Sequence, residues 1–376
     1  MTPAQDSGLP ILDLDGVLAA LGIASDGAKS RAPYTVIRGH EGPRWLIPDG
    51  SRLAQTILSE WRPYGLLTRL FWRAVPMANR LGILPLLPGN ARALLPSDAT
   101  GQFMSRIGRH SDASLPVILV GNPTTTRKLL VFLEEPSLNR NVLVKVPLTA
   151  PARASIQNEA RILDRLNGRL RAPRLLYVHE DAGIAMQEYL PGKLGSRRCK
   201  PAYVQLLLEL TEKNERISLQ SCGRRLAERL CNLPAYAENA ARVDSALALL
   251  DRDADLPSAL VHGDFAPWNI RELPGGACAL IDWEAARQGG LPLHDLCHFY
   301  YMQSKLFAPE RLFYLDLLRE SAWRSYCRQL DVDPSLLKQL AAAFLIEMLA
   351  RHWEASETGT DKFCLRQLGL LLEFAS

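Results

Sequence analysis

The order of strand and helix patterns along the chain is the feature that most restricts its fold. From Leu115 the pattern predicts three strands, one helix and two further strands, whereas almost everything after Pro191 has a helical pattern. The strands are expected at 117–120, 128–133, 142–146, 175–178 and 184–189, with the helix at 152–166. A small sheet followed by a larger helical body predicts two lobes with a cleft between them.

The first hundred residues have a different pattern. Tyr34–Arg38 and Arg44–Pro48 flank a turn and predict a hairpin. Helical patterning follows from about Leu53 to Leu86, with breaks expected at Pro63 and Pro76. We therefore expect an N-terminal extension of hairpin and amphipathic helices at 1–105, a small lobe built on a sheet at 106–190 and a helical lobe at 191–376.

One short motif in the extension suggests another fold. Asp13–Gly16 matches the DxDG opening of haloacid-dehalogenase-type phosphatases. That fold needs well over a hundred further residues with a downstream lysine and an acidic pair, and the segment before the sheet is too short. A short leader element with a turn at Asp15-Gly16 is the preferred interpretation.

Composition excludes several classes of protein. The chain is 47% apolar and 22% charged, which is ordinary for a soluble protein, and no run of eighteen apolar residues suggests a membrane-spanning helix. Its seven cysteines include no CxxC pair, so we expect reduced thiols and a cytoplasmic location. The net charge of +4 is too small to favour nucleic acid, but residues 1–190 carry +6 and residues 191–376 carry −2, which suits an anionic ligand held by the first half.

The most informative segment runs from Leu260 to Asp282. An apolar strand leads into a polar loop, and a second short strand follows and ends on Asp282. Asp264, Asn269 and Asp282 can therefore converge at the ends of neighbouring strands. Two carboxylates and an amide are oxygen ligands of the kind that Mg²⁺ prefers, and phosphoryl transfer needs an aspartate to orient the acceptor hydroxyl.

These residues resemble a known family. His262-Gly263-Asp264 followed by Asn269 is similar to the HGDxxxxN catalytic loop of aminoglycoside phosphotransferases and choline-kinase-like enzymes, which are relatives of protein kinases. Asp282-Trp283-Glu284 and His294-Asp295-Leu296 resemble the metal-binding segment and the helix after it, and the resemblance covers residues 110–376 approximately. It implies an α+β, two-lobed protein-kinase-like fold: a small antiparallel five-stranded N-lobe with one helix, and a larger, mostly helical C-lobe, here with an N-terminal extension. Residues 106–190 would then form the nucleotide-binding lobe.

The resemblance also implies roles for these side chains. Asp264 would be the catalytic base, and Asn269 and Asp282 would be the metal ligands. Asp295 would be a structural acid that braces the catalytic loop, and His262 a scaffold residue rather than a base.

A lysine inside the third predicted strand supports this interpretation independently. Lys145 lies in the apolar sequence Val142–Val146, and a buried ammonium needs a partner, which Glu159 on the next helix could provide. The resemblance implies that Lys145 contacts the nucleotide phosphates and that Glu159 fixes its position. The alternative is a solvent-exposed lysine on an edge strand.

Two further segments are expected to contact the nucleotide. Gly121–Arg127 would lie over the phosphates, although it has one glycine and Pro123 has no N–H, so Thr124 and Thr125 would supply donors instead. The segment Gln187-Glu188-Tyr189 resembles the linker between lobes, whose backbone would bind a purine, either adenine or guanine.

The helix after Pro63 carries a stripe of arginines, Arg62, Arg69, Arg73 and Arg80, with no acidic residue between them. Residues 61–83 could form an interfacial helix on an anionic membrane or a membrane-bound partner. The preferred alternative is a helix packed on the kinase core whose arginines snorkel to solvent.

Features of the C-lobe bear on the acceptor. Asp333-Pro334 predicts the start of a long helix through Phe344 and His352, and family members bind substrate through such helices. The acidic stretch Asp251–Asp255 could attract a cationic substrate, but a solvated loop is preferred.

The sequence therefore predicts a Mg²⁺-dependent kinase that transfers the γ-phosphoryl group of ATP or GTP to a hydroxyl of a small, sugar-like or amino-alcohol acceptor. Two alternatives stay open. One is a non-catalytic nucleotide-binding scaffold of the same fold, and the other is a membrane-associated kinase that acts on a lipid-linked acceptor.

Overall fold

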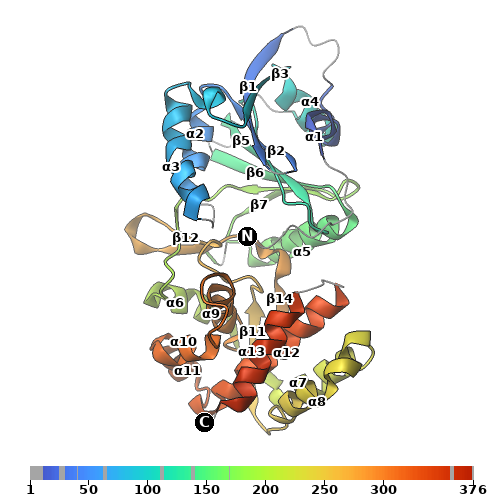
Figure 1. Ribbon diagram of the computed structural model, residues 1–376, viewed down its shortest axis with the longest axis vertical. Helices are drawn as coiled ribbons and strands as arrows, with labels where there is room; N and C mark the ends of the chain where they lie inside the picture. The colour runs from blue at the N-terminus through green and yellow to red at the C-terminus, as the bar shows by residue number, and fades with distance from the viewer. Residues whose placement is uncertain are drawn as a thin grey trace. The chain divides into compact units, whose positions relative to one another are not determined.

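Figure 1 shows the computed structural model of the chain, which describes residues 12–24, 30–39, 41–61, 66–110, 114–136, 140–168, 170–355 and 360–374. The chain divides into two compact units, Met1–Lys193 and Leu194–Ser376. The first unit contains both the segment predicted as an extension and the predicted nucleotide-binding lobe. Strand β9 (Lys193–Leu194) contains the boundary between the units.

The first unit is built on one antiparallel sheet of eight strands in the order β3-β1-β2-β4-β5-β6-β8-β7. Its strands are β1 (Arg31–Gly39), β2 (Gly42–Pro48), β3 (Asn90–Pro96), β4 (Val117–Val120), β5 (Lys128–Glu135), β6 (Arg140–Pro147), β7 (Leu175–His179) and β8 (Ile184–Glu188). The expected α+β class and the five expected strands are present, but the expectation of a five-stranded sheet was wrong. The predicted hairpin and β3 continue the same sheet.

Helices cover both faces of this sheet. They are α1 (Leu14–Leu21), α2 (Arg52–Glu60), α3 (Leu66–Arg80), the 3₁₀ turn η1 (Leu84–Leu86), α4 (Ala99–Arg106) and α5 (Ala150–Leu166). Helices α1 and α4 pack on one face, whereas α2 and α3 pack on the other (Figure 1).

The sequence of β4 explains why the extra elements are needed. All four of its residues are buried, with Ile118 and Val120 in the core under α1 and α4, and Val117 and Leu119 in the core under α2 and α3. Because successive side chains of a strand point to opposite faces, an unbroken apolar strand needs cover on both sides. The N-terminal hundred residues supply that cover and the three additional strands.

Two local expectations for this region were wrong. Asp13 does not precede a turn at Asp15-Gly16; it is the N-cap of α1, and its carboxylate accepts the Gly16 N–H at 2.8 Å. Pro76 lies inside α3 rather than ending a helix. Arg62 and the break expected at Pro63 lie outside the described residues.

The second unit is mostly helical. Its helices are α6 (Pro201–Glu209), α7 (Leu219–Leu230), α8 (Pro234–Ala248), α9 (His294–Phe307), α10 (Phe313–Arg319), α11 (Ala322–Leu330), α12 (Leu337–Glu354) and α13 (Thr360–Glu373), with 3₁₀ turns η3 (Pro274–Gly276), η4 (Trp283–Ala285) and η5 (Pro334–Leu336). Its strands are β10 (Thr211–Ser218), β11 (Asp255–Val261), β12 (Ile270–Glu272), β13 (Cys278–Leu280) and β14 (Arg287–Gly290).

Helix α12 is the centre of this unit. It packs against α7, α8, α9 and α13, and most of its residues are buried. Asp333 was predicted to cap this helix, but it caps the turn η5 that leads into α12: its carboxylate accepts the Ser335 N–H at 2.9 Å. In the described part of the chain, no helix is both long and apolar enough to cross a bilayer.

Candidate active site

The loop between β11 and β12 presents Asp264. The Asn269 side-chain amide donates to the backbone carbonyl of Asp264 at 2.9 Å and to its Oδ2 at 2.8 Å. The Asp264 side chain is about a third exposed, whereas Asn269 is buried. The loop therefore closes on itself through Asn269 and leaves one carboxylate partly open to a ligand.

Asp295, in the first turn of α9, holds the start of this loop. Its two carboxylate oxygens accept the N–H groups of His262 at 2.7 Å and Gly263 at 2.9 Å. Gly263 has φ +78°, and a Cβ there would lie 2.5 Å from the Ala285 carbonyl oxygen, so only glycine fits. The bracing contact that the resemblance implied for Asp295 is present in this geometry.

His262 is buried, and both of its ring nitrogens have backbone partners. Nδ1 accepts the Asp264 N–H at 3.3 Å, and Nε2 lies 3.0 Å from the Ile281 carbonyl, to which it donates in the matching tautomer. A histidine held in this way ties the loop to the segment after β13. This placement fits a scaffold rather than a proton-transfer group.

Asp282 follows β13 in a left-handed conformation, with φ 67° and ψ 64°. Backbone strain of this kind is concentrated at functional sites. Burial, together with the nearby Asp282 carboxylate, raises the pKa of Asp264 to about 7, and the Asn269 hydrogen bond opposes the rise.

These residues fit a divalent cation. The carboxylates of Asp264 and Asp282 repel each other, and a bound cation would relieve that repulsion. The Asn269 amide nitrogen is used in the loop, so its Oδ1 is the atom that could face a metal. A set of hard oxygen donors suits Mg²⁺ rather than a soft metal.

In the first unit, Lys145 and Glu159 form a buried ion pair. Lys145 lies on β6, between β5 and β8, and its Nζ is 2.7 Å from Oε2 of Glu159 on α5. The exposed fractions are 3% for Lys145 and 1% for Glu159. The edge-strand alternative for Lys145 is excluded, because β6 has a partner on each side.

The loop 121–127 joins β4 to β5. The Gly121 N–H donates to the Lys128 carbonyl at 2.9 Å, and a Cβ on Gly121 would lie 2.7 Å from that oxygen, so this close approach requires glycine. Thr124 and Thr125 are exposed, and the Thr124 hydroxyl lies 3.4 Å from that of Thr126. The loop thus presents a group of hydroxyls next to a tight turn.

The predicted linker begins inside the sheet. Gln187 is buried in β8, paired with Leu143, and the Glu188 N–H donates to the Arg174 carbonyl at 2.9 Å. The Tyr189 N–H donates to the Asn141 carbonyl at 3.0 Å. The N–H groups of Glu188 and Tyr189 are therefore already bonded within this unit.

Glu60 on α2 was missed in the sequence. Its carboxylate accepts the Tyr189 hydroxyl, and its Oε1 accepts the Gly192 N–H at 3.1 Å. A residue of the N-terminal helices thus fixes the segment that leaves the sheet. No sequence signal identifies Glu60, because 129 residues separate it from Tyr189.

Two arginines, one beside the loop 121–127 and one at its end, were also missed. Arg44 on β2 donates to the Val120 carbonyl, directly before Gly121. Burial and the positive charge of Arg127 lower the pKa of Arg44 to about 10. The position of Arg127 at the end of the loop was a usable signal, whereas Arg44 comes from the distant hairpin.

His298 is the missed residue nearest to Asp264. Its Nε2 lies 3.8 Å from Oδ1 of Asp264, and its Nδ1 lies 3.2 Å from the Phe265 carbonyl. Burial lowers the pKa of His298 to about 3, so the ring is neutral at physiological pH. Its spacing of four residues from His294 on one helix was the signal available in the sequence.

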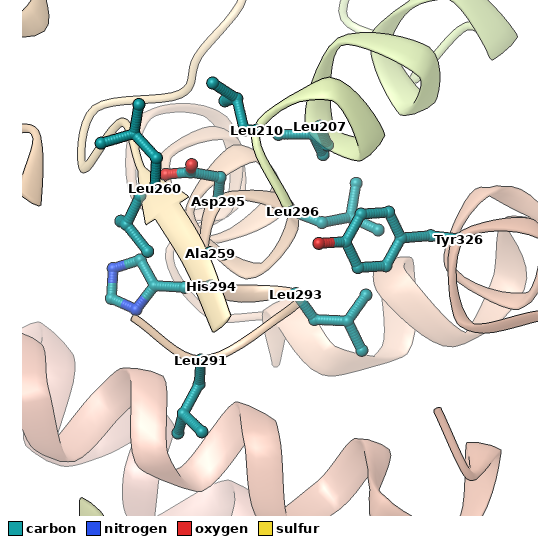
Figure 2. A pocket seen from close by; sticks show the side chains of 11 residues that line it. Leu207, Leu210, Ala259, Leu260, Leu291, Leu293, His294, Asp295, Leu296 and Tyr326 are labelled. Carbon is teal, nitrogen blue, oxygen red and sulfur yellow. The ribbon is translucent and has the colours of Figure 1, made fainter. Parts of the chain in front are cut away.

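Figure 2 shows a small cavity lined mainly by apolar side chains of α6, β11 and the segment before α9. The Asp295 carboxylate and the Tyr326 hydroxyl are among its polar groups. Its volume of about 10 Å³ is close to what one water molecule needs. The cavity is therefore a packing defect and not an acceptor site.

Comparison with known proteins gives one family. The model of the phosphotransferase enzyme family matches residues 130–327, which are 198 of the 376 residues. A search of the curated proteins found no match.

The solved structures that are similar at low identity include the following three. Choline kinase LicA from Streptococcus pneumoniae is 16% identical, with 65% of this chain and 88% of that chain covered and a TM-score of 0.46. Aminoglycoside phosphotransferase APH(4)-Ia is 13% identical (72% and 96% covered, TM-score 0.49). Macrolide 2'-phosphotransferase type I is 15% identical (73% and 97% covered, TM-score 0.48). At these values the chemistry of the site has to come from this chain's own residues.

Proposed function

Because the chain belongs to the phosphotransferase enzyme family, we propose that it is a small-molecule kinase that transfers the γ-phosphoryl group of ATP or GTP to an acceptor hydroxyl. The observation that carries the proposal is the loop around Asp264. Its backbone is held by Asp295, its closure depends on Asn269, and the Asp264 carboxylate is left partly exposed. A carboxylate fixed in this way can align a hydroxyl for phosphoryl transfer.

In the proposed reaction Asp264 acts as the base. The acceptor oxygen forms a bond to the γ-phosphorus while the bond from that phosphorus to the β,γ-bridging oxygen breaks, so the nucleoside diphosphate leaves with the electron pair. Asp264 receives the proton of the acceptor hydroxyl. The neutral ring of His298 adds no charge beside the carboxylate.

The remaining residues position the phosphates. Asn269 and Asp282 would hold Mg²⁺, which neutralises phosphate charge when it is bound. Lys145, held by Glu159, contacts the phosphates, and Thr124 and Thr125 donate from the loop over them. Arg44 and Arg127 add positive charge beside that loop.

The metal assignment predicts a specific loss in Asp282→Asn. Mg²⁺-dependent nucleotide affinity, measured by calorimetry, should fall by about 10-fold or more, because one charged ligand contact is removed. Affinity measured in EDTA should not change. An unaltered Mg²⁺ dependence would remove Asp282 from the metal site.

A second candidate, a kinase that docks on a membrane and acts on a lipid-linked acceptor, is favoured by the exposed face of α3. Trp72, Val75 and Ala78 pack on the core, so this face of α3 is buried as the packed-helix interpretation expected. The opposite face exposes an apolar stripe: Leu70 is 54% exposed, Met77 57% and Leu81 62%. A water-facing apolar stripe on a packed helix is typical of a docking surface.

Charge favours an anionic bilayer as the occupant of this stripe. Arg73 and Arg80 are exposed and lie along one side of the stripe, and residues 61–97 contain no acidic residue. The side chain of Arg69 is outside the described part of the structure. Trp61 and Trp72 take no part, because both pack against Trp45.

Co-sedimentation with vesicles tests this candidate. The affinity of the chain for phosphatidylserine-containing vesicles should fall by about 30-fold in Arg73→Gln/Arg80→Gln, at about 1 kcal/mol for each arginine. The matched control Arg161→Gln/Arg165→Gln, on the exposed side of α5, should bind like the wild type. Equal sedimentation of the wild type and Arg73→Gln/Arg80→Gln would exclude membrane docking by α3.

A further inference from the structure

One face of α12 carries a phenylalanine followed by three charged side chains, and it lies near the catalytic loop. Phe344, Glu347, Arg351 and Glu354 follow one another at spacings of three or four residues and so share a face of the helix. The Phe344 ring packs against His294 on α9 at 5.0 Å and against His298 at 6.1 Å, measured between ring centroids. This face therefore contacts α9. The same helix carries Asp295, and its His298 lies next to Asp264.

Both glutamates of the row already have partners. Glu347 forms an ion pair with Arg287 of β14 and lies 3.5 Å from Nδ1 of His294. Glu354 pairs with Arg229 of α7 at 2.9 Å. The acids on this face are therefore neutralised by arginines from neighbouring elements.

Arg351 lies between these two glutamates and differs from them. Its side chain is half-buried, and among the residues that the structure describes no ion pair or hydrogen bond engages its guanidinium. Its charge acts on Asp264, whose pKa it lowers, so the two groups are electrostatic neighbours. Burial has the largest effect on the pKa of Arg351 and lowers it, and repulsion from Arg287 lowers it further.

The two histidines of α9 that lie beside this face add no charge to it. His294 and His298 are both buried, which lowers the pKa of each and leaves them neutral at physiological pH. Asp251 and Asp255 belong to the acidic stretch that could attract a cationic substrate, but both are exposed and have other partners. Asp251 accepts from Gln220, and Asp255 pairs with Arg216. Arg351 is therefore a half-buried arginine near the proposed base that has no ion-pair partner among the described residues.

We propose that the acceptor carries an oxyanion group, either a phosphate ester or a carboxylate, which binds Arg351 while the hydroxyl to be phosphorylated lies at Asp264. This inference rests on the proposed function, since the acceptor must come within hydrogen-bond reach of Asp264 to lose its proton. A guanidinium matches a carboxylate or phosphate in bidentate geometry, and pairing offsets the cost of its burial. A cationic acceptor such as an amino sugar would meet the repulsion of Arg351.

Calorimetric titration of inorganic phosphate tests the oxyanion site. The full chain is first saturated with Mg²⁺ and a non-hydrolysable ATP analogue, so that the positions of the nucleotide phosphates are filled. Phosphate should then bind the wild type, and Arg351→Gln should weaken binding by about 10- to 100-fold, the loss expected for one charge-assisted contact. Arg351→Lys should recover part of the lost phosphate affinity. The control Arg328→Gln, on the exposed side of α11, should leave phosphate affinity unchanged.

The outcomes separate this inference from the proposed function. The oxyanion site is overturned if phosphate and acetate bind the wild type and Arg351→Gln with equal affinity, or if they bind neither protein. Failure of the ATP analogue to bind the wild type would instead contradict the kinase assignment. Tighter binding of acetate than of phosphate assigns the group as a carboxylate, and the reverse assigns a phosphate ester.

A panel of related acceptors gives a second readout. Glucose, glucose 6-phosphate, glucuronate and glucosamine differ mainly in charge, and phosphate uptake from ATP should favour the two anions in the wild type. That preference should disappear in Arg351→Gln. Preference for glucosamine in the wild type would overturn the inference and leave kinase activity established.

Discussion

Asp264→Asn should lower kcat by about 10²–10⁴-fold, which is the usual contribution of a positioned acid or base. The amide has the shape of the carboxylate but cannot accept the proton of the acceptor hydroxyl. Nucleotide affinity should stay within a few-fold, because the substitution leaves Lys145 and Asp282 intact. Steady-state kinetics for kcat and calorimetry for nucleotide binding measure the two effects on the same sample.

Asp253→Asn is the matched control for this substitution. Asp253 is exposed and lies in the loop before β11, so the same chemical change should leave kcat unaltered. A fall in nucleotide affinity as large as the fall in turnover would reassign Asp264 to metal binding. Full turnover in Asp264→Asn would contradict the mechanism.

Lys145→Ala and Glu159→Ala should be strongly non-additive. Each substitution leaves one buried charge without its partner, so each should lower the free energy of unfolding by about 3–5 kcal/mol. The double variant should lose less than the sum of the two, and the losses in kcat/KM should be non-additive too, since either change alone breaks the arrangement. Denaturant unfolding and initial rates measure the two cycles.

The pair Arg216 and Asp255 serves as the control cycle. Their ion pair is 3.0 Å long, but both side chains are about half exposed, so its contribution should stay below about 1 kcal/mol. Additive losses in kcat/KM for Lys145→Ala and Glu159→Ala would mean that the two residues act separately.

The parts of the site that the sequence predicts are those whose geometry is local. Asp264 and Asn269 are five residues apart in one loop, so their contact follows from the motif itself. Lys145 and Glu159 lie on a strand and the next helix, and an ammonium in an apolar strand demands a nearby acid. Short sequence separation and a strong energetic demand make such contacts predictable.

The eight-stranded sheet was not predictable in the same way. The turn between them identified the strands β1 and β2 as a hairpin, but a turn does not say which sheet a hairpin joins. The pairing of β2 with β4 joins residues more than seventy positions apart, Trp45 with Leu119 and Leu46 with Ile118. The one signal was the fully apolar β4, which requires cover on both faces.

The charge that would face the acceptor was also not predictable from the sequence. Arg351 is unremarkable on an amphipathic helix, and its significance comes from the pairing of Glu347 with Arg287, 60 residues away, and of Glu354 with Arg229, 125 residues away. Residues 191–376 carry a net charge of −2, whereas the face of α12 near Asp264 contributes the positive charge of Arg351. Net charge over a unit does not specify the charge of a site within it.

Transfer of an isotopically labelled γ-phosphoryl group tests the central claim most directly. The chain is incubated with Mg²⁺, with ATP or GTP that carries ¹⁸O on the γ-phosphate, and with a panel of hydroxylated small molecules. The masses of the products are then measured by mass spectrometry. A labelled phosphate ester should form on an acceptor hydroxyl with the wild type and fall to background with Asp264→Asn. Tight nucleotide binding without labelled product from any acceptor would contradict the kinase assignment and identify the chain as a non-catalytic nucleotide-binding protein.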